Sequence, residues 1–103
     1  MLIVRSRNGV AVRLTQERWQ HITHRHPEMS DWREQVLDTV AQPDCIQAGD
    51  YGVLLAIRKY TDTPFATKHL VVVYREIGAE DGFVLTAYFT GGPSARRKML
   101  WKR

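Results

Sequence analysis

The spacing of hydrophobic and polar residues changes along this chain, and the changes predict its elements. Two short apolar runs flank an Asn-Gly pair in residues 2–14, which is typical of a β-hairpin with a tight turn. Helical spacing then follows over residues 16–26, where Thr15 stands at the N-cap position and Pro27 ends the helix. We therefore expect a hairpin followed directly by a helix.

A second helix is predicted for residues 31–41. Trp32, Val36 and Val40 repeat every four residues, which places them on one face of a helix. Ser30 is in position to cap the first turn, and a proline soon after the last turn stops the helix.

The second half of the chain has the composition of strands. Residues 52–60, 68–77 and 83–90 are rich in β-branched and aromatic side chains, and their connections, residues 61–67 and 78–82, suit antiparallel hairpins. A short segment near 44–47 is a candidate edge strand, and the basic tail holds an apolar Met-Leu-Trp anchor. The predicted fold is a single α+β domain, residues 1–103, with two N-terminal helices packed on an antiparallel sheet of four to five strands.

Composition limits the function classes. The 103 residues are 44% hydrophobic, and no apolar run approaches the length of a membrane span or forms a signal peptide, so we expect no membrane association. Cys45 has no second cysteine to pair with, which suits the reducing cytoplasm. The net charge of +4 and the pI of about 9.6 favour an anionic partner such as nucleic acid.

Three of the four histidines lie close together at the end of the first helix. At 100° per residue, His26 shares the inward arc with Trp19 and Ile22, whereas His21 and His24 fall farther round the helix. For His24 the simplest interpretation is a solvated position. For His26 the alternative to a functional role is a half-buried imidazole bonded to a backbone carbonyl.

The same histidines do not predict a metal site. His21 and His24 have a permissible spacing for zinc, but further ligands would have to come from distant residues such as His69 or Cys45. The sequence also has no recognisable metal or cofactor motif. We expect neither a metal nor a cofactor.

Alternation along the last predicted strand places three hydroxyls, Thr86, Tyr88 and Thr90, on one face. They either belong to an ordinary surface strand or form a polar floor that binds an anion. Arg58 and Arg75, on the neighbouring strands, are either solvated charges or guanidiniums that bind phosphate with paired hydrogen bonds.

Imidazoles, guanidiniums and hydroxyls together suit metal-free RNA cleavage. In that reaction a base removes the 2′-OH proton, the oxygen attacks the adjacent phosphorus, and an acid protonates the leaving 5′-oxygen. Histidine suits both proton transfers because its usual pKa of about 6.5 lies near neutral pH.

The stretch W-Q-H-I-T-H-R-H-P-E and the strand T-A-Y-F-T resemble the small BECR-fold nucleases, a group that includes barnase, EndoU, the RNase colicins and RelE-type toxins. The resemblance extends over about residues 14–90 and implies a barnase-like fold. It also implies an active site of a helix histidine, an arginine and a Thr-x-Tyr pair, here His21 or His26, Arg58 or Arg25, and Thr86 with Tyr88.

We therefore expect a metal-independent, toxin-like endoribonuclease that acts on tRNA or mRNA in the cytoplasm and is held by a small antitoxin or immunity protein. The alternative is a non-catalytic RNA- or protein-binding module of the same fold. This hypothesis requires the end of the first helix to meet the hydroxyl face of the last strand. The predicted catalytic residues are His21, His26, Thr86 and Tyr88, and the predicted phosphate-binding residues are Arg25, Arg58, Arg75 and Thr90.

Overall fold

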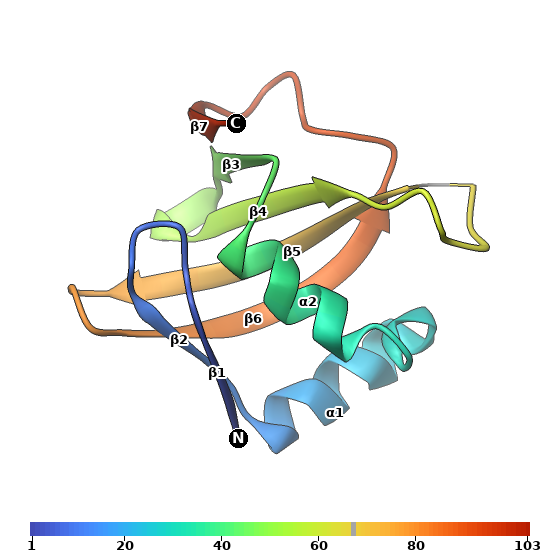
Figure 1. Ribbon diagram of the computed structural model, residues 1–103, viewed down its shortest axis with the longest axis horizontal. Coiled ribbons are helices and arrows are strands. Elements are labelled where there is room, and N and C mark those ends of the chain that lie inside the picture. Colours follow the sequence, from blue (N-terminus) through green and yellow to red (C-terminus); the bar gives the residue numbers. More distant parts are fainter. Residues whose placement is uncertain (67) are drawn as a thin grey trace.

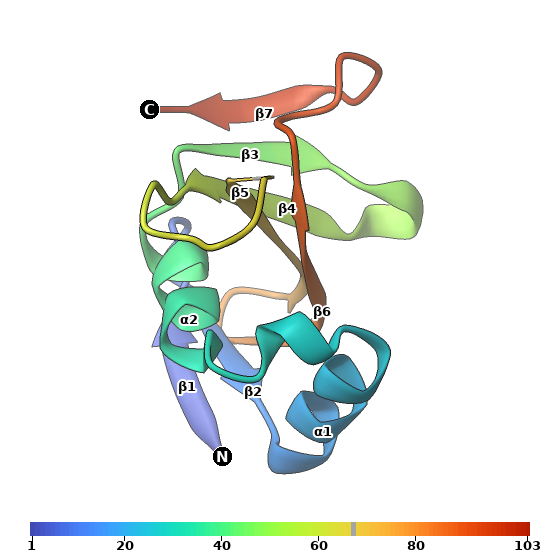
Figure 2. The same cartoon turned by 90° about the vertical axis from the view of Figure 1, so that its right-hand side faces the viewer.

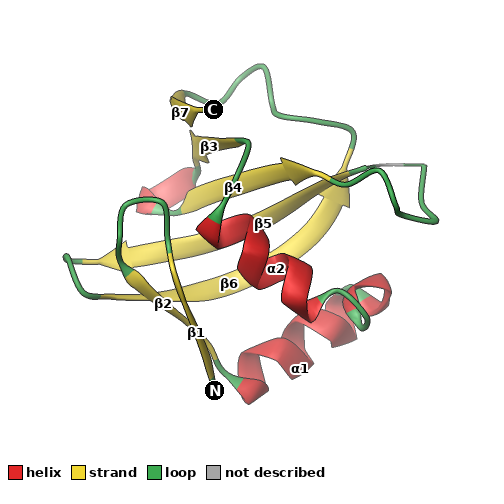
Figure 3. Ribbon diagram, in the orientation of Figure 1, coloured by secondary structure: helices red, strands yellow, loops and turns green. Residues whose placement is uncertain are grey.

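The computed structural model describes residues 1–66 and 68–103. Figures 1 and 3 show its elements along the chain. In order they are β1 (Leu2–Arg5), β2 (Ala11–Leu14), α1 (Gln16–Arg25), the 3-10 turn η1 (Pro27–Met29), α2 (Arg33–Ala41), β3 (Cys45–Ala48), the 3-10 turn η2 (Asp50–Gly52), β4 (Leu54–Lys59), β5 (His69–Ile77), β6 (Asp81–Thr90) and β7 (Met99–Lys102).

The N-terminal predictions are confirmed. Strands β1 and β2 pair antiparallel, and Gly9 in the turn has a φ of 82°, a value that glycine adopts without strain. Thr15 caps α1, because its hydroxyl accepts a hydrogen bond of 3.1 Å from the backbone N–H of Arg18. The helix ends at Arg25, two residues before the proline.

The start of the second helix was predicted wrongly. It begins at Arg33, after η1, and Ser30 does not cap it. The Ser30 hydroxyl donates instead to the Pro27 carbonyl at 2.8 Å, which completes the 3-10 turn. Among the described residues no side chain caps α2, whose N-cap position is taken by Trp32. The local hydrogen bond competes with the capping role that the sequence pattern suggested.

The predicted sheet of four to five antiparallel strands is also wrong. In the described part of the chain seven strands form one mixed sheet, in the order β1-β2-β6-β5-β4-β3-β7. The N-terminal hairpin joins through a short parallel pairing of β2 with β6, at Val12–Gly82 and Arg13–Phe83. The basic tail forms β7 and pairs with β3, so the segment predicted as an edge strand has a neighbour on each side.

The three longer strands were predicted correctly, and β4, β5 and β6 form an antiparallel meander. The connection predicted for residues 61–67 ends at Thr67, which lies outside the described residues. Within the described residues, neither α-helix is long and apolar enough to cross a membrane.

The sheet has an apolar cluster on each face. On the face covered by α2, the main core includes Ile22, Met29, Val36, Val72 and Tyr74 (Figures 1 and 2). On the opposite face a smaller cluster is formed by Cys45, Leu55, Ile57 and Val71, with Tyr88 packed against it. Helix α1 lies beside β6, at the edge that β2 leaves uncovered after two paired residues (Figure 2).

The connection from β6 to β7 is fastened to β3 by Gln47. This side chain is buried, and its amide both donates to the Ser94 carbonyl at 2.8 Å and accepts from the Ser94 N–H at 3.1 Å. A buried amide with both of its groups paired fixes a loop more firmly than an apolar contact would.

Tyr74 gives a prediction about stability. Its ring is fully buried in the main core, and its hydroxyl has no hydrogen-bond partner among the described residues. Burial, and then the charge of Glu76, raise the pKa of Tyr74 above its ordinary value. The folded state therefore disfavours the phenolate, so the contribution of Tyr74 to the free energy of unfolding is constant below about pH 10 and falls as the pH rises further.

We expect Tyr74→Phe to raise the free energy of unfolding at pH 7 by about 1 kcal/mol, because an unpaired hydroxyl is removed from the core. The variant should also lose less stability between pH 9 and about pH 11, as measured by urea unfolding. Tyr51→Phe is the control, since that side chain is 94% exposed and should change neither quantity. A lower free energy of unfolding for Tyr74→Phe than for the wild type would show that the Tyr74 hydroxyl does have a hydrogen-bond partner.

Candidate functional site

His26 lies against Tyr88, at the place where α1 ends beside β6. The two ring centroids are 6.2 Å apart and the ring planes are tilted by 35°. His26 is the C-cap of α1, and its backbone N–H donates to the Ile22 carbonyl at 2.8 Å. The end of the first helix therefore meets the late strand, as the functional hypothesis required.

Glu28 accompanies the imidazole. Its carboxylate oxygen Oε2 lies 3.9 Å from His26 Nδ1, and the His26 side chain is 32% exposed. Within residues 1–66 and 68–103, no hydrogen bond joins the His26 side chain to a backbone carbonyl. The alternative role for His26, a half-buried imidazole bonded to such a carbonyl, is therefore not supported. The carboxylate lies on the Nδ1 side of the imidazole, so Nε2 is the nitrogen left for a second interaction.

The hydroxyl row lies on the sheet face opposite α2. Tyr88 pairs with Val71 across β5, and both belong to the smaller apolar cluster. His26 reaches this face from α1, which runs along the edge of β6 and not across the middle of the sheet (Figure 2). The Tyr88 ring thus packs on the smaller apolar cluster, and it contacts His26 at the β6 edge of the sheet.

Two further residues continue the row across the sheet. Thr90 pairs with His69 on β5, and His69 pairs with Lys59 on β4, so the three side chains stand on the same face as Tyr88. Directly paired residues have Cβ atoms about 5 Å apart, and diagonal neighbours about 7–8 Å. His69 is therefore a diagonal neighbour of Tyr88, and the surface offers two imidazoles, the three hydroxyls of the row and an ammonium.

Sequence reasoning missed His69, Glu28 and Lys59 as parts of this surface. His69 was considered only as a distant metal ligand. Alternation along β5 puts it on the face of Val71, so pairing the two predicted strands in register would have found it beside Thr90. The signal for Glu28 was its position two residues after His26.

Two of the predicted phosphate-binding arginines do not join the site. Arg58 lies on the α2 side of the sheet, where its guanidinium stacks 5.2 Å from the Tyr60 ring centroid and Nη1 lies 3.4 Å from the Gln42 carbonyl. Arg75 pairs with Phe83, four residues along β5 from Val71, which is about 13 Å at 3.3 Å per residue.

The remaining predicted residues are near the site or outside it. Thr86 pairs with Val73, one step along the hydroxyl row from Tyr88. Arg25 is exposed, one residue before His26. His21 lies elsewhere on α1, in a hollow of about 300 Å³ that it shares with Thr15, Glu17 and Arg18.

Cys45 is not a nucleophile for this surface. It is buried in the cluster beneath Tyr88, and burial, followed by the charge of Asp44, raises the pKa of its thiol. A raised pKa keeps the unreactive thiol form at neutral pH. In the described part of the chain, no three histidine, cysteine, aspartate or glutamate side chains are grouped as a metal site requires.

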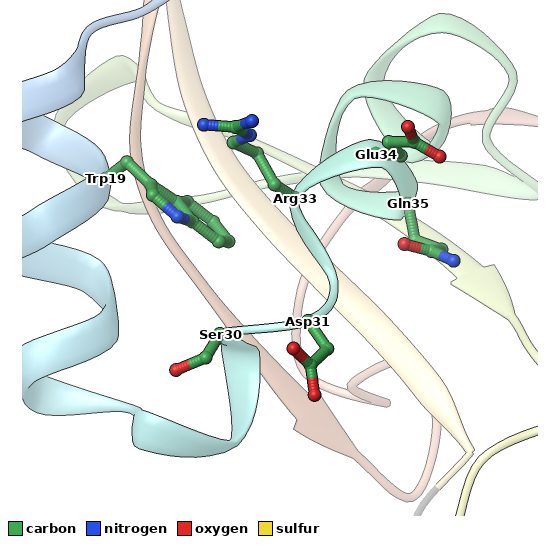
Figure 4. Close-up of a pocket in the computed structure, with 6 residues that line it drawn as sticks. All are labelled: Trp19, Ser30, Asp31, Arg33, Glu34 and Gln35. Carbon is green, nitrogen blue, oxygen red and sulfur yellow. The ribbon is translucent and has the colours of Figure 1, made fainter.

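A separate hollow of about 410 Å³ lies between α1 and the start of α2. Figure 4 shows the Trp19 ring on the α1 side, facing the loop that carries Ser30 and Asp31 and the first turn of α2. Glu34 and Arg33 give its rim charges of both signs. None of the predicted catalytic or phosphate-binding residues line it.

No known protein family, curated protein or solved structure matches this chain. The geometry of the His26–Tyr88 surface is therefore the basis for assigning a function.

Proposed function

We propose that this protein is a metal-independent endoribonuclease that cleaves RNA at the His26–Tyr88 pair. The observation that supports the proposal is the contact of these two rings at 6.2 Å, with a carboxylate at His26 Nδ1 and a second imidazole farther along the same face. The pair combines an imidazole, which can take up or release a proton, with hydroxyls that donate to phosphate oxygens.

His26 acts as the general base in this proposal. Its imidazole takes the proton of the ribose 2′-OH, and the resulting imidazolium is stabilised by Glu28. The 2′-oxygen attacks the adjacent phosphorus, and the bond from phosphorus to the 5′-oxygen breaks. The products are a 2′,3′-cyclic phosphate and a free 5′-hydroxyl.

The residues around His69, at the other end of the hydroxyl row, take part in the departure of the leaving group. Protonated His69 gives its proton to the leaving 5′-oxygen, while the hydroxyls of Tyr88 and Thr90 donate hydrogen bonds to the non-bridging oxygens. Lys59, paired with His69, adds positive charge where the transition state is most negative. Arg25, which is exposed and directly precedes His26, is the proposed phosphate-binding arginine on the helix side.

The proposed substrates are tRNA or mRNA of the cytoplasm, in keeping with the net charge of +4 and the unpaired, buried Cys45. A toxin of this kind needs an inhibitor in the cell that makes it, so a small acidic antitoxin or immunity protein is the proposed second partner.

One observation favours a second candidate, a non-catalytic RNA-binding module. The guanidiniums of Arg58 and Arg75 do not reach the His26–Tyr88 pair, so the proposed transition state has fewer cations than the sequence suggested. Such a module would bind RNA on the same face and release it uncleaved.

The test is to incubate the protein with mixed tRNA and an unstructured RNA in EDTA, and to analyse the product ends. We expect cleavage to persist in EDTA, to leave 2′,3′-cyclic phosphates, and to be absent on DNA of the same sequence. Loss of cleavage in EDTA, or 5′-phosphate products, would contradict the mechanism. Binding without cleavage after long incubation would support the module.

A further inference from the structure

A second aromatic and cationic contact lies far from the His26–Tyr88 pair. The guanidinium carbon of Arg7, in the turn between β1 and β2, lies 4.7 Å from the centroid of the Trp101 indole on β7. Strands β1 and β7 are the first and last in the order of the sheet, so this contact joins the turn after one edge strand to the other edge strand. Stacking of a guanidinium on tryptophan is a favourable cation–π arrangement.

Arg7 is held in place by its neighbours in the turn. Ser6 and Asn8, on either side of it, both donate hydrogen bonds to the Glu76 carboxylate. The Ser6 hydroxyl also accepts from the Val10 N–H at 3.2 Å, inside the turn. The loop is thus tied to β5, and a guanidinium on a fixed loop loses little freedom when a ligand binds.

The contact borders a hollow of about 260 Å³ whose lining comes from three parts of the chain. The described residues that line it are Arg7, Ala41, Gln42, Pro43, Trp101 and Arg103. None of these is acidic, and the nearby Asp44 carboxylate pairs with Arg103 at 3.5 Å, which leaves Arg7 as the lining cation without a carboxylate among its described ion pairs. Its volume is slightly below the range of about 300–1,000 Å³ for drug-sized ligands. The hollow therefore suits a single planar group with an attached anion.

We propose that this hollow binds one nucleotide, either a free nucleoside monophosphate or one nucleotide of a single-stranded RNA. The base stacks on the Arg7–Trp101 pair, since bases stack on both aromatic rings and guanidinium planes. Gln42 lines the hollow and would contact the base edge. Arg103 would bind the phosphate with the donors left over from its ion pair with Asp44, in which its Nη1 lies 3.5 Å from Asp44 Oδ1.

The nucleotide hollow is distinct from the His26–Tyr88 pair. Trp101 pairs with Ile46, and Ile46 with Ala56, so its side chain stands on the α2 side of the sheet and not on the Tyr88 side. From β6 to β7 there are four strand spacings, about 19 Å at 4.8 Å each. The proposal therefore does not depend on whether the protein cleaves RNA.

The test measures binding of adenosine, guanosine, cytidine and uridine monophosphates by NMR shifts of the Trp101 indole, with ribose 5-phosphate as the ligand that lacks a base. We expect nucleotides to bind at least ten-fold more tightly than ribose 5-phosphate. Arg7→Ala and Trp101→Leu should each weaken nucleotide binding by about ten-fold, the size of one lost stacking interaction.

Arg7→Lys and Arg33→Ala separate stacking from charge. Arg7→Lys keeps the charge but loses the planar group, so it should weaken binding nearly as much as Arg7→Ala. Arg33→Ala removes one positive charge elsewhere and should change binding less than about three-fold. Because Arg7 is an exposed turn residue, its variants test the proposal even if Trp101→Leu does not fold.

Equal binding of nucleotides and ribose 5-phosphate, together with full binding by Arg7→Lys, would overturn the proposal in favour of a plain anion site. Absence of indole shifts with every nucleotide would also overturn it, as would displacement of bound nucleotide by an acidic peptide that binds more tightly. Cleavage without nucleotide binding would reject this hollow alone, and binding without cleavage would reject the nuclease alone.

Discussion

Replacing His26 by alanine is expected to lower the rate of RNA cleavage by about two to four orders of magnitude. The expected loss is large because the substitution removes the imidazole that is the proposed general base and that lies beside Glu28. Single-turnover cleavage of a labelled RNA, with protein in excess, measures the chemical step without product release. Far-ultraviolet circular dichroism should be unchanged, since the His26 side chain is partly exposed and its backbone hydrogen bond remains.

His21→Ala is the matched control, because His21 lies on the same helix but lines a different hollow. We expect its cleavage rate to stay within about two-fold of the wild type, since it has no part in the proton transfers. Glu28→Gln should reduce the rate less than His26→Ala, because the base remains and loses only its charged partner. Equal rates for His26→Ala and wild type would exclude the proposed centre.

Replacing Met29 by alanine is expected to lower the free energy of unfolding by about 2–5 kcal/mol. Met29 lies in η1, is 0% exposed, and belongs to the main core beneath the two helices. Its backbone N–H also donates to the His26 carbonyl at 2.9 Å. A cavity here should therefore loosen the site as well as the core. Urea unfolding at pH 7 measures the first effect, and the cleavage rate well below the unfolding midpoint measures the second.

Met99→Ala is the control for this substitution, since that methionine lies in β7 and is 40% exposed. Its expected cost is below about 1 kcal/mol, because most of the removed surface already contacts water. If Met29→Ala lowers the free energy of unfolding no more than Met99→Ala does, the core around η1 must rearrange to fill the cavity, which would contradict this prediction.

Sequence reasoning succeeded where the deciding interactions are local. The first hairpin depends on an Asn-Gly turn, and α1 depends on the Thr15 cap and the following proline; each lies within a few residues of the element it defines. The meeting of His26 with the hydroxyl row was also predicted, but not its geometry: His26 is the non-helical C-cap of α1 and contacts Tyr88 on the opposite sheet face from the core that holds Ile22.

It failed where partners are distant in the chain. β2 and β7 have four residues each, too few for alternation to indicate which strand they join, and their neighbours are chosen by packing. Arg58 was placed on the wrong face for a related reason. In β4 the side chains of Ala56 and Ile57 are both buried, on opposite faces, so hydrophobicity does not distinguish one face from the other.

The pairing of Val12 with Gly82 has a consequence for how the chain reaches its native state. The hairpin is synthesised about 70 residues before the strand that accepts it, since Val12 pairs with Gly82. Until then β2 exposes a hydrogen-bonding edge with no partner, and such edges recruit other unfolded chains. We therefore expect refolding to be limited by the closing of this long loop, with yields that fall as protein concentration rises.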